Sequence, residues 1–306
     1  MAQQTEALAR PFRFQASRRW RRIAIEQQGF LIGAVAVIAF MLFWEWAGTS
    51  GVVNPMFTSA PSRIVKTADK LFFDGGIGAM FAALFAGNLA GAWAVVQKGS
   101  IWKDIWVSSQ EVAWGYMLAL AVGIPLGLMM GWFRRLNYIL SPFVSALYAT
   151  PSVALIALYI IWFGIGMNSK IAVIFMSSIF YPLIYARAGV STVDANILKC
   201  AKSFGANDFQ LLRTVVLPSS VPYLMAGARL GLGRGLVGMV VGELYAATAG
   251  VGYLITVAGA TFQTDKVFVG VLIVTFAGVG LTAVLQRIED RFSSWRPRLN
   301  EESSEN

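Results

Sequence analysis

The chain has 306 residues, of which 57% are hydrophobic and only 13% charged, and its mean hydropathy is +0.61. Soluble domains carry roughly 25% charged residues, so this chain has too few charges to cover a water-facing surface. Histidine is absent and Cys200 is the single cysteine, which excludes histidine catalysis, histidine metal sites and an internal disulfide. The net charge of +9 comes from basic residues beside apolar runs, so we expect no nucleic-acid partner.

Apolar runs along the chain have the length of about 20 residues that a helix needs to cross some 30 Å of hydrocarbon. They lie at 30–46, 110–133, 142–163, 171–190, 221–246 and 267–286. The first run is too long for a signal peptide and lacks a clear cleavage site. The sequence therefore predicts an all-α membrane protein with about six transmembrane helices. We expect a basic cytoplasmic arm at 1–29, a transmembrane domain at 30–290 and a polar cytoplasmic tail at 291–306.

A further apolar segment at 77–96 is rich in alanine and glycine and has Asn88 in its middle. With six spans and a cytoplasmic N-terminus, 18 of the 25 basic residues lie inside or at the inner edge. A crossing by 77–96 would move every later loop to the other side of the membrane. The basic N-terminal arm and the basic C-terminal tail would then lie on opposite sides. The positive-inside rule therefore predicts that this segment does not span but forms an outer-surface, re-entrant or peripheral helix.

Glycines recur every four residues in two of the predicted spans. Small residues at this spacing let helix backbones approach closely in lipid, so we interpret them as packing faces. They are Gly123, Gly127 and Gly131, then Gly227, Gly231 and Gly235, then Gly238 and Gly242. The pattern from Gly233 to Gly238 also fits a dinucleotide motif, but no strand precedes it. No P-loop motif occurs, so the chain does not bind ATP through a P-loop of its own.

The polar loop at 191–219, between the fourth and fifth predicted spans, has the signals of two short helices. Thr192 or Asp194 can start the first helix, and Gly205 supplies a break at which a left-handed backbone is tolerated. Asn207 and Gln210 have the spacing of a capping box for a second helix at 208–216.

The second helix is predicted to carry Phe209, Leu212 and Val216 on one face. Leu217 and Pro218 are predicted to end it and turn the chain back toward the bilayer. A folded helix–turn–helix with an apolar stripe suits docking into a groove on a soluble partner, and an ordinary ordered loop is the alternative.

The loop resembles the EAA motif of ABC importer permeases, which reads Glu-Ala-Ala, three residues, Gly, nine residues, Ile, one residue, Leu-Pro. The spacing is matched throughout, at Lys199, Cys200, Ala201, Gly205, Val215, Leu217 and Pro218. In that family the loop forms a coupling helix that sits in a cleft of the ATPase subunit. Lys199 stands where the family has Glu, and Cys200 stands where it has the first Ala. The reversed charge puts in doubt any ion pair that the usual Glu makes, but it does not affect the expected fold of the loop.

From about residue 61 to residue 291 the chain resembles the nitrate, sulfonate, taurine and bicarbonate branch of these permeases. The similar segments are 151–166, 242–255 and 264–270, with Ala157 in place of a second proline. The resemblance implies the type I importer fold and a multi-pass permease in the lipid of the bacterial inner membrane. It also implies a second copy of this chain, two ABC ATPase subunits that bind ATP and Mg, and an extracytoplasmic substrate-binding protein. The permease itself would catalyse no reaction and bind no cofactor or metal, and its substrate would be a small anion.

Ionisable and aromatic residues within the spans are candidates for the translocation pathway. Arg234 could attract an anion or extend to the inner headgroups, whereas Arg229 is expected to reach those headgroups. Glu243 is expected to pair with a basic residue or to contact the binding protein, and the tyrosines could line the pathway or only pack. The candidates are Tyr148, Pro151, Tyr159, Arg234 and Glu243.

A gradient-driven secondary transporter is the alternative function. Such a carrier needs coupling acids near the middle of the membrane and often shows inverted repeats. Glu243 is the only candidate acid on a later span, and no internal repeat is evident. An intramembrane enzyme is disfavoured because the chain has neither histidine nor an acid pair at catalytic spacing.

Overall fold

A computed structural model describes residues 14–292 apart from 55, 74 and 75. Residues 1–13 of the predicted arm and 293–306 of the predicted tail lie outside the described part. The described residues are helical and include no strand. The chain divides into two units, residues 1–65 and residues 66–306.

The first unit is dominated by α1 (Phe14–Thr49), a single helix of 36 residues. It contains the predicted first span and extends it toward the N-terminus through half of the predicted arm. Its C-terminal end is tied to the start of α2 (Pro61–Phe72). The carboxylate of Glu45 accepts hydrogen bonds from the backbone N–H and the hydroxyl of Ser62, at 3.0 and 2.6 Å. Glu45 thereby satisfies a backbone donor at the start of α2, one of those that a helix leaves unpaired at its N-terminus.

The second unit contains the remaining helices. In chain order they are α3 (Ile77–Phe85), α4 (Leu89–Gln97), α5 (Ile101–Trp132), α6 (Arg134–Ala149), η1 (Ser152–Leu155), α7 (Ile156–Phe163), α8 (Met167–Ser178), α9 (Phe180–Ser191), α10 (Ala195–Ser203), α11 (Asp208–Leu211), η2 (Leu212–Val216), α12 (Leu217–Ala246), α13 (Val251–Ala260) and α14 (Thr264–Phe292). Within the described residues of both units, five helices are long and apolar enough to cross a membrane, or six if one bent pair counts as a span. The predicted architecture of about six membrane helices is confirmed.

The predicted span at 142–163 is the bent pair and not one straight helix. Its two parts, α6 and the η1–α7 segment, meet at 90°. The bend falls at Thr150 and Pro151, both of which have extended backbones. A proline disfavours helical geometry at the residue before it, and this explains why α6 ends at Ala149.

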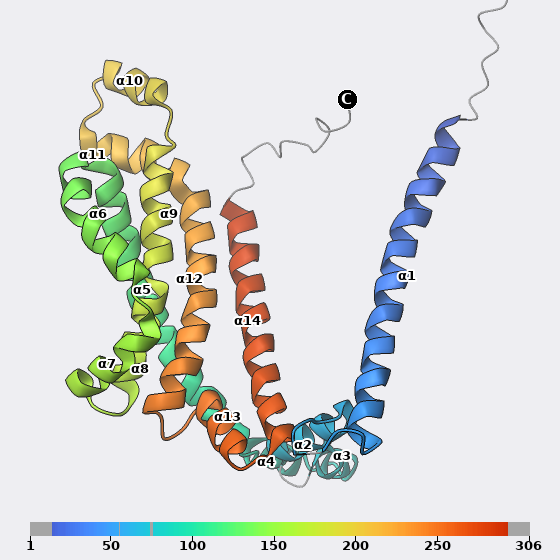
Figure 1. The fold of residues 1–306 in the computed structure, drawn as a ribbon. Helices are drawn as coiled ribbons and strands as arrows, with labels where there is room; N and C mark the ends of the chain where they lie inside the picture. The colour runs from blue at the N-terminus through green and yellow to red at the C-terminus, as the bar shows by residue number, and fades with distance from the viewer. Residues whose placement is uncertain (1–13, 55, 74–75, 293–306) are drawn as a thin grey trace, which may run out of the picture. The chain divides into compact units, whose positions relative to one another are not determined.

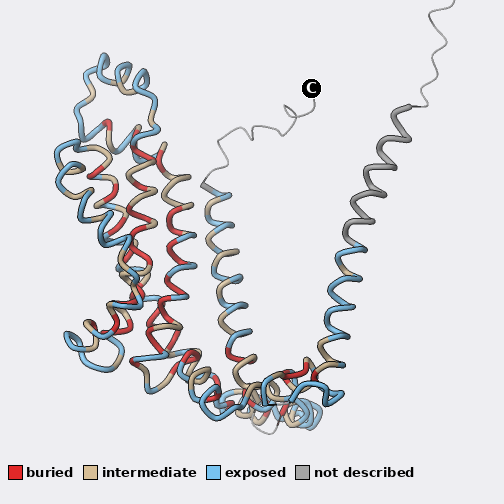
Figure 2. The backbone as a smooth tube through the Cα atoms, in the orientation of Figure 1, coloured by how far each residue is buried: buried red, intermediate tan, exposed pale blue. Residues whose placement is uncertain are grey.

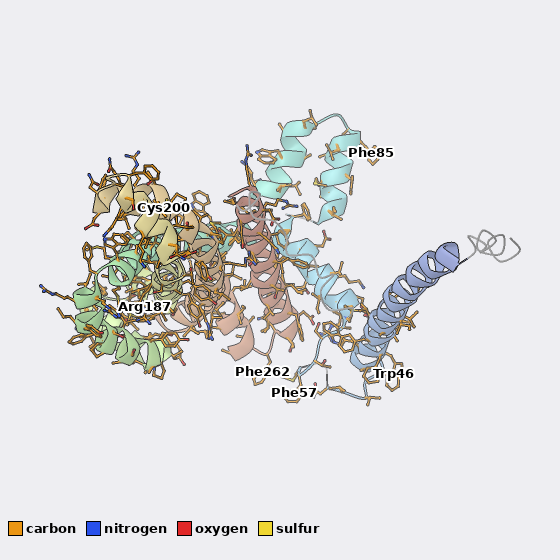
Figure 3. All side chains as sticks on the ribbon, turned by 90° about the horizontal axis from the view of Figure 1, so that it is seen from above. Trp46, Phe57, Phe85, Arg187, Cys200 and Phe262 are labelled. Carbon is orange, nitrogen blue, oxygen red and sulfur yellow. The ribbon has the colours of Figure 1, made fainter. Side chains whose placement is uncertain are left out.

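The segment at 77–96 forms no span-length helix, as predicted. It is a hairpin of α3 and α4, each nine residues long, which pack against each other. Gly87 turns the chain with a φ of +71°, and the Asn88 side chain caps α4 by accepting from the Gly91 N–H at 2.7 Å. Phe85 lies at the tip of the hairpin and is 91% exposed (Figure 3).

Four elements, α5, α8, α9 and α12, form the buried centre of the second unit (Figure 2). Their contacts follow the predicted glycine faces. A Cβ on Gly127 of α5 would lie 2.2 Å from the carbonyl oxygen of Leu183 in α9. A Cβ on Gly227 of α12 would lie 2.7 Å from the Cβ of Tyr185. The backbones therefore approach closer than any larger residue would permit, which is how helices pack in lipid.

One end of the second unit gathers the arginines of several helix ends. The α10–α11 loop, the start of α6 and the C-terminal end of α14 lie at one end, and α7, α13 and the α3–α4 hairpin at the other (Figure 1). The first end carries Arg134, Arg135, Lys199, Lys202, Arg213, Arg287 and Arg291. We call it the basic end, and the positive-inside rule predicts that it faces the cytoplasm.

Candidate functional site

The loop at 191–219 protrudes from the basic end as two short helices (Figure 1). Asp194 caps α10 by accepting a hydrogen bond from the Asn196 N–H at 2.8 Å. Gly205 has a φ of +82°, so the predicted left-handed break between the helices is confirmed. The predicted capping box is also present: Asn207 accepts from the Gln210 N–H at 2.8 Å, and Gln210 accepts from the Asn207 N–H at 2.9 Å.

The prediction that Leu217 and Pro218 end the second helix was wrong. The π-helical segment η2 carries α11 directly into α12, and Pro218 lies in the first turn of α12. The change to π-helical hydrogen bonding, in which the Leu217 N–H donates to the Leu212 carbonyl, accommodates Pro218 without ending the helix. The loop therefore connects rigidly to the fifth predicted span.

The apolar residues of this second helix do not share one exposed face. Phe209 is 69% exposed, whereas Leu212 is half-buried and Val216 is fully buried. The sequence analysis missed Phe204, which follows α10 and is 88% exposed. The loop therefore exposes three apolar side chains, which we call the loop apolar residues: Ile197, Phe204 and Phe209.

The positions that match the EAA motif are mostly accessible. Lys199, Cys200, Gly205, Leu217 and Pro218 are exposed, while Ala201 and Val215 are half-buried. Cys200 lies on α10, at the basic end from which Figure 3 is drawn. Lys202 forms an exposed ion pair with Asp208 at 3.5 Å, which joins α10 to α11. The loop therefore has a fixed backbone and an accessible surface of mixed apolar and basic character.

A cavity of about 330 Å³ lies between the α6–α7 corner, the α8–α9 helices and α12. Of the predicted pathway residues, Tyr148, Pro151 and Arg234 line it. Its wall also includes Thr150, Ser152, Ser177, Tyr181 and Val237. The wall thus brings one guanidinium and several hydroxyl groups together within otherwise apolar helices.

Arg234 provides the charge of this cavity. Its guanidinium carbon lies 5.7 Å from the centre of the Tyr181 ring, a cation–π arrangement. Among the described residues it has no carboxylate partner. Arg229, five residues earlier, forms an ion pair with Glu289 of α14, a partner that was not predicted from the sequence.

Tyr159 and Glu243, the other predicted pathway residues, do not line this cavity. Tyr159 is buried in a cluster with Ile156 and Val173. Glu243 is fully buried near the end of α12 and accepts hydrogen bonds from the Ser108 hydroxyl and the Gly252 N–H, both at 2.5 Å. It therefore receives hydrogen bonds in place of the basic partner that the sequence suggested.

Glu243 belongs to a polar cluster that fixes the start of α13. The backbone N–H groups of Gly250 and Val251 donate to Asp104 and to Ser108, each at 2.9 Å. Three consecutive N–H groups at the N-terminus of α13 are thereby satisfied by side chains of α5 and α12.

The same face of α5 carries Glu111, which forms a buried ion pair with Lys170 of α8. This ion pair was not predicted from the sequence. Asp104, Ser108 and Glu111 follow one another at spacings of four and three residues, the period of a helix face. This periodicity of polar residues inside an apolar run was the signal that could have revealed the cluster.

The second unit is a bundle of glycine-packed membrane helices with a two-helix loop at its basic end. A solved structure of the MetNI methionine ABC transporter in an inward-facing conformation shares this fold. The TM-score is 0.51 at 17% sequence identity, with 60% of this chain and 95% of that chain covered.

Residues 123–294 match the family of binding-protein-dependent transport system inner membrane components. The chain is 31% identical over 278 residues to the taurine transport system permease protein TauC of Escherichia coli (strain K12), which covers 90% of this chain and 93% of TauC. It is 27% identical over 271 residues to the putative aliphatic sulfonates transport permease protein SsuC of Bacillus subtilis (strain 168), covering 89% and 90% of the two chains. A probable ABC transporter permease of Brucella abortus (strain 2308) is 32% identical over 207 residues, covering 68% and 83%.

The chain therefore belongs to the family of binding-protein-dependent transport system inner membrane components. It is the permease subunit of an ABC importer and a multi-pass protein of the inner membrane. The resemblance drawn from the sequence is confirmed.

Proposed function

We propose that this permease imports a small organic anion of the sulfonate class, driven by ATP hydrolysis on partner subunits that dock at the loop 191–219. The observation that carries the coupling proposal is the exposed surface of this loop. The substrate class is supported by the similarity to permeases named for taurine and aliphatic sulfonates. It is also supported by Arg234, which lines the membrane cavity and has no carboxylate partner among the residues that the structure describes.

The loop has the properties of a docking element. Caps at Asp194 and Asn207 hold its backbone, so docking would not require the loop to become ordered. Phe204 and Phe209 are largely exposed, and burying one such side chain contributes roughly 1.5–3 kcal/mol. A groove on a soluble partner that covers them would use the helix-in-groove mode of recognition. The continuous passage from α11 through η2 into α12 would transmit a movement of the loop to the span that carries Arg234.

The assembly that we propose contains two copies of this chain, two ABC ATPase subunits on the cytoplasmic side and one substrate-binding protein outside. ATP and Mg would be held by the ATPase subunits, since this sequence has no P-loop. Closure of the ATPases would move the two loops and switch the membrane helices between inward-facing and outward-facing states.

The experiment is isolation of the tagged chain from native membranes in a gentle detergent, with partners identified by mass spectrometry. We expect a P-loop ATPase in equal amount to the permease. The variant in which Phe204 and Phe209 are both alanine should lose at least about tenfold of the recovered ATPase, on the basis of roughly 1.4 kcal/mol per factor of ten. Phe85→Ala is the matched control, because Phe85 is equally exposed but lies on the α3–α4 hairpin at the opposite end.

Uptake of taurine and ethanesulfonate into vesicles then separates the two energy sources. Import that depends on ATP and stops with vanadate supports the proposal. Recovery of the permease without an ATPase, with uptake that a protonophore abolishes while ATP is maintained, would replace it by a gradient-driven carrier.

A further inference from the structure

The environment of Arg234 is unusual for a charged residue on a membrane helix. Arg234 lies twelve residues before the C-terminal end of α12, which is about 18 Å along the helix axis at 1.5 Å per residue. Its side chain is exposed, not buried among the helices of its own chain. An ionised side chain at this depth is costly against lipid, so charged residues in spans face the interior of a bundle or a water-filled space. The exposed face of α12 at Arg234 is therefore a face that lipid does not cover.

The residues that follow at helical spacing lead into the same cavity. Val237, Gly238 and Val241 lie three, four and seven residues after Arg234, and all four line its wall. Val237 is also 56% exposed. Gly238 lets the backbone of α12 approach α8, since a Cβ there would lie 2.8 Å from the Ser177 hydroxyl oxygen. The stripe places the guanidinium at the edge of a cavity that opens to the surface of the chain.

The polar groups that share the cavity wall with Arg234 include hydroxyls that can donate hydrogen bonds. Ser177 lines the cavity, and its buried hydroxyl has no hydrogen-bond partner among the described residues. Tyr148 and Tyr181 also line the wall, with ring centres 6.2 Å apart in an edge-to-face arrangement. Tyr181 stacks beneath the guanidinium and holds it toward the cavity. The acids that might neutralise Arg234 are engaged elsewhere: Glu111 pairs with Lys170, and Glu243 accepts hydrogen bonds at the start of α13.

We propose that Arg234, Ser177 and the tyrosines at 148 and 181 form a binding station for the oxyanion head of the substrate within the translocation pathway. A planar guanidinium can donate two parallel hydrogen bonds to the oxygens of a sulfonate, and the hydroxyl groups supply donors for the remaining oxygen. The cavity of about 330 Å³ is at the small end of ligand sites and suits a compact organic sulfonate. The station selects for negative charge within the membrane, in addition to any selection of the substrate outside the membrane. This proposal rests on the proposed function.

The test uses charge-selective labelling of the full-length permease, as isolated from its membrane and reconstituted in nanodiscs, without ATP. Cys200 is replaced by serine, and Val237→Cys supplies one thiol in the cavity, with Ser152→Cys as a second reporter on the opposite wall. The probes are two methanethiosulfonates of similar size, one carrying a sulfonate and the other a trimethylammonium group. We expect the sulfonate reagent to react faster, and Arg234→Gln to reduce the ratio of the two rates by roughly tenfold, as expected for a charge a few ångströms away in a partly hydrated site. Arg234→Lys should keep most of the ratio.

Competition supplies the second readout. Ethanesulfonate should slow labelling of Val237→Cys in the presence of Arg234 but not in Arg234→Gln, whereas uncharged ethanesulfonamide should have no effect. A rate ratio that does not change in Arg234→Gln would overturn the station, and so would the absence of labelling at both reporter positions, because the cavity would then not admit water. Val279→Cys on the exposed face of α14 is the control and should show no dependence on Arg234. Because the labelling needs neither ATP nor transport, a failure of ATP-driven import would refute the proposed function and leave this result standing.

Discussion

Replacing Gly205 by valine isolates the role of the loop backbone. Gly205 has a φ of +82°, and no atom lies within 4 Å of the position that a Cβ would occupy. The substitution therefore creates no collision, and its cost is torsional. An L-residue in the left-handed region costs about 1–2 kcal/mol, and a β-branched residue is disfavoured further. This range corresponds to a shift of roughly five- to thirtyfold in the balance between the native loop and alternative backbones.

We expect Gly205→Val to insert into the membrane normally but to reduce substrate imported per ATP hydrolysed by at least about fivefold, because a docking loop works only in its native conformation. The assay is simultaneous measurement of taurine uptake and phosphate release in proteoliposomes that contain the complete importer. Gly205→Asn should lie within about twofold of the parent, since asparagine tolerates the left-handed backbone.

The matched control for this substitution is Gly87→Val. Gly87 turns the α3–α4 hairpin with a φ of +71° and also has no atom within 4 Å of a new Cβ, so the strain is the same but the site is not in the loop. Full coupling in Gly205→Val, or equal loss of coupling in Gly87→Val, would refute the reasoning.

Three further predictions concern the packing of the second unit. Gly127→Val should lower the thermal stability of the complex in detergent by several degrees, because its Cβ would lie 2.2 Å from the Leu183 carbonyl, whereas Gly233→Ala, with nothing within 4 Å, should leave it unchanged. Glu111→Gln and Lys170→Met should each lower the free energy of unfolding by about 3–5 kcal/mol, because a buried charge is costly chiefly when its partner is removed. The double variant Glu111→Leu with Lys170→Met should recover most of this loss. An equal loss in the double variant would contradict the reasoning. Ser108→Ala should raise the rate of amide hydrogen exchange at Val251 by roughly five- to 150-fold, because the Val251 N–H loses its acceptor at a cost of about 1–3 kcal/mol. An unchanged exchange rate would show that the cluster does not hold α13.

Periodicity and composition predicted the helices because both act locally. The lengths of the apolar runs follow from the thickness of the bilayer, so the spans were placed before any tertiary contact was known. The capping box at Asn207 and the left-handed break at Gly205 were also predicted, since each depends on residues a few positions apart. The glycine faces were recognised for the same reason.

Features that depend on how helices meet were not predictable from one sequence. The ion pair of Glu111 and Lys170 joins residues 59 positions apart, and only the packing of α8 on α5 brings them together. Pro218 was interpreted as a helix end because a proline often ends a helix, but the π-helical turn before it lets the helix continue. Tyr159 and Tyr148 have similar sequence contexts, yet the 90° corner at Pro151 turns one into the core and the other toward the cavity.

The central claim is that the loop at 191–219 couples this permease to an ATPase subunit, and Cys200 offers a direct test of it. As the only cysteine of the chain, exposed on α10, it can be labelled with a short photo-crosslinker in inside-out membranes without any substitution. Irradiation should join Cys200 to a P-loop ATPase, and the yield should fall in the variant that lacks both loop phenylalanines. Efficient labelling of Cys200 that captures no ATPase in membranes active for ATP-driven import would contradict the account.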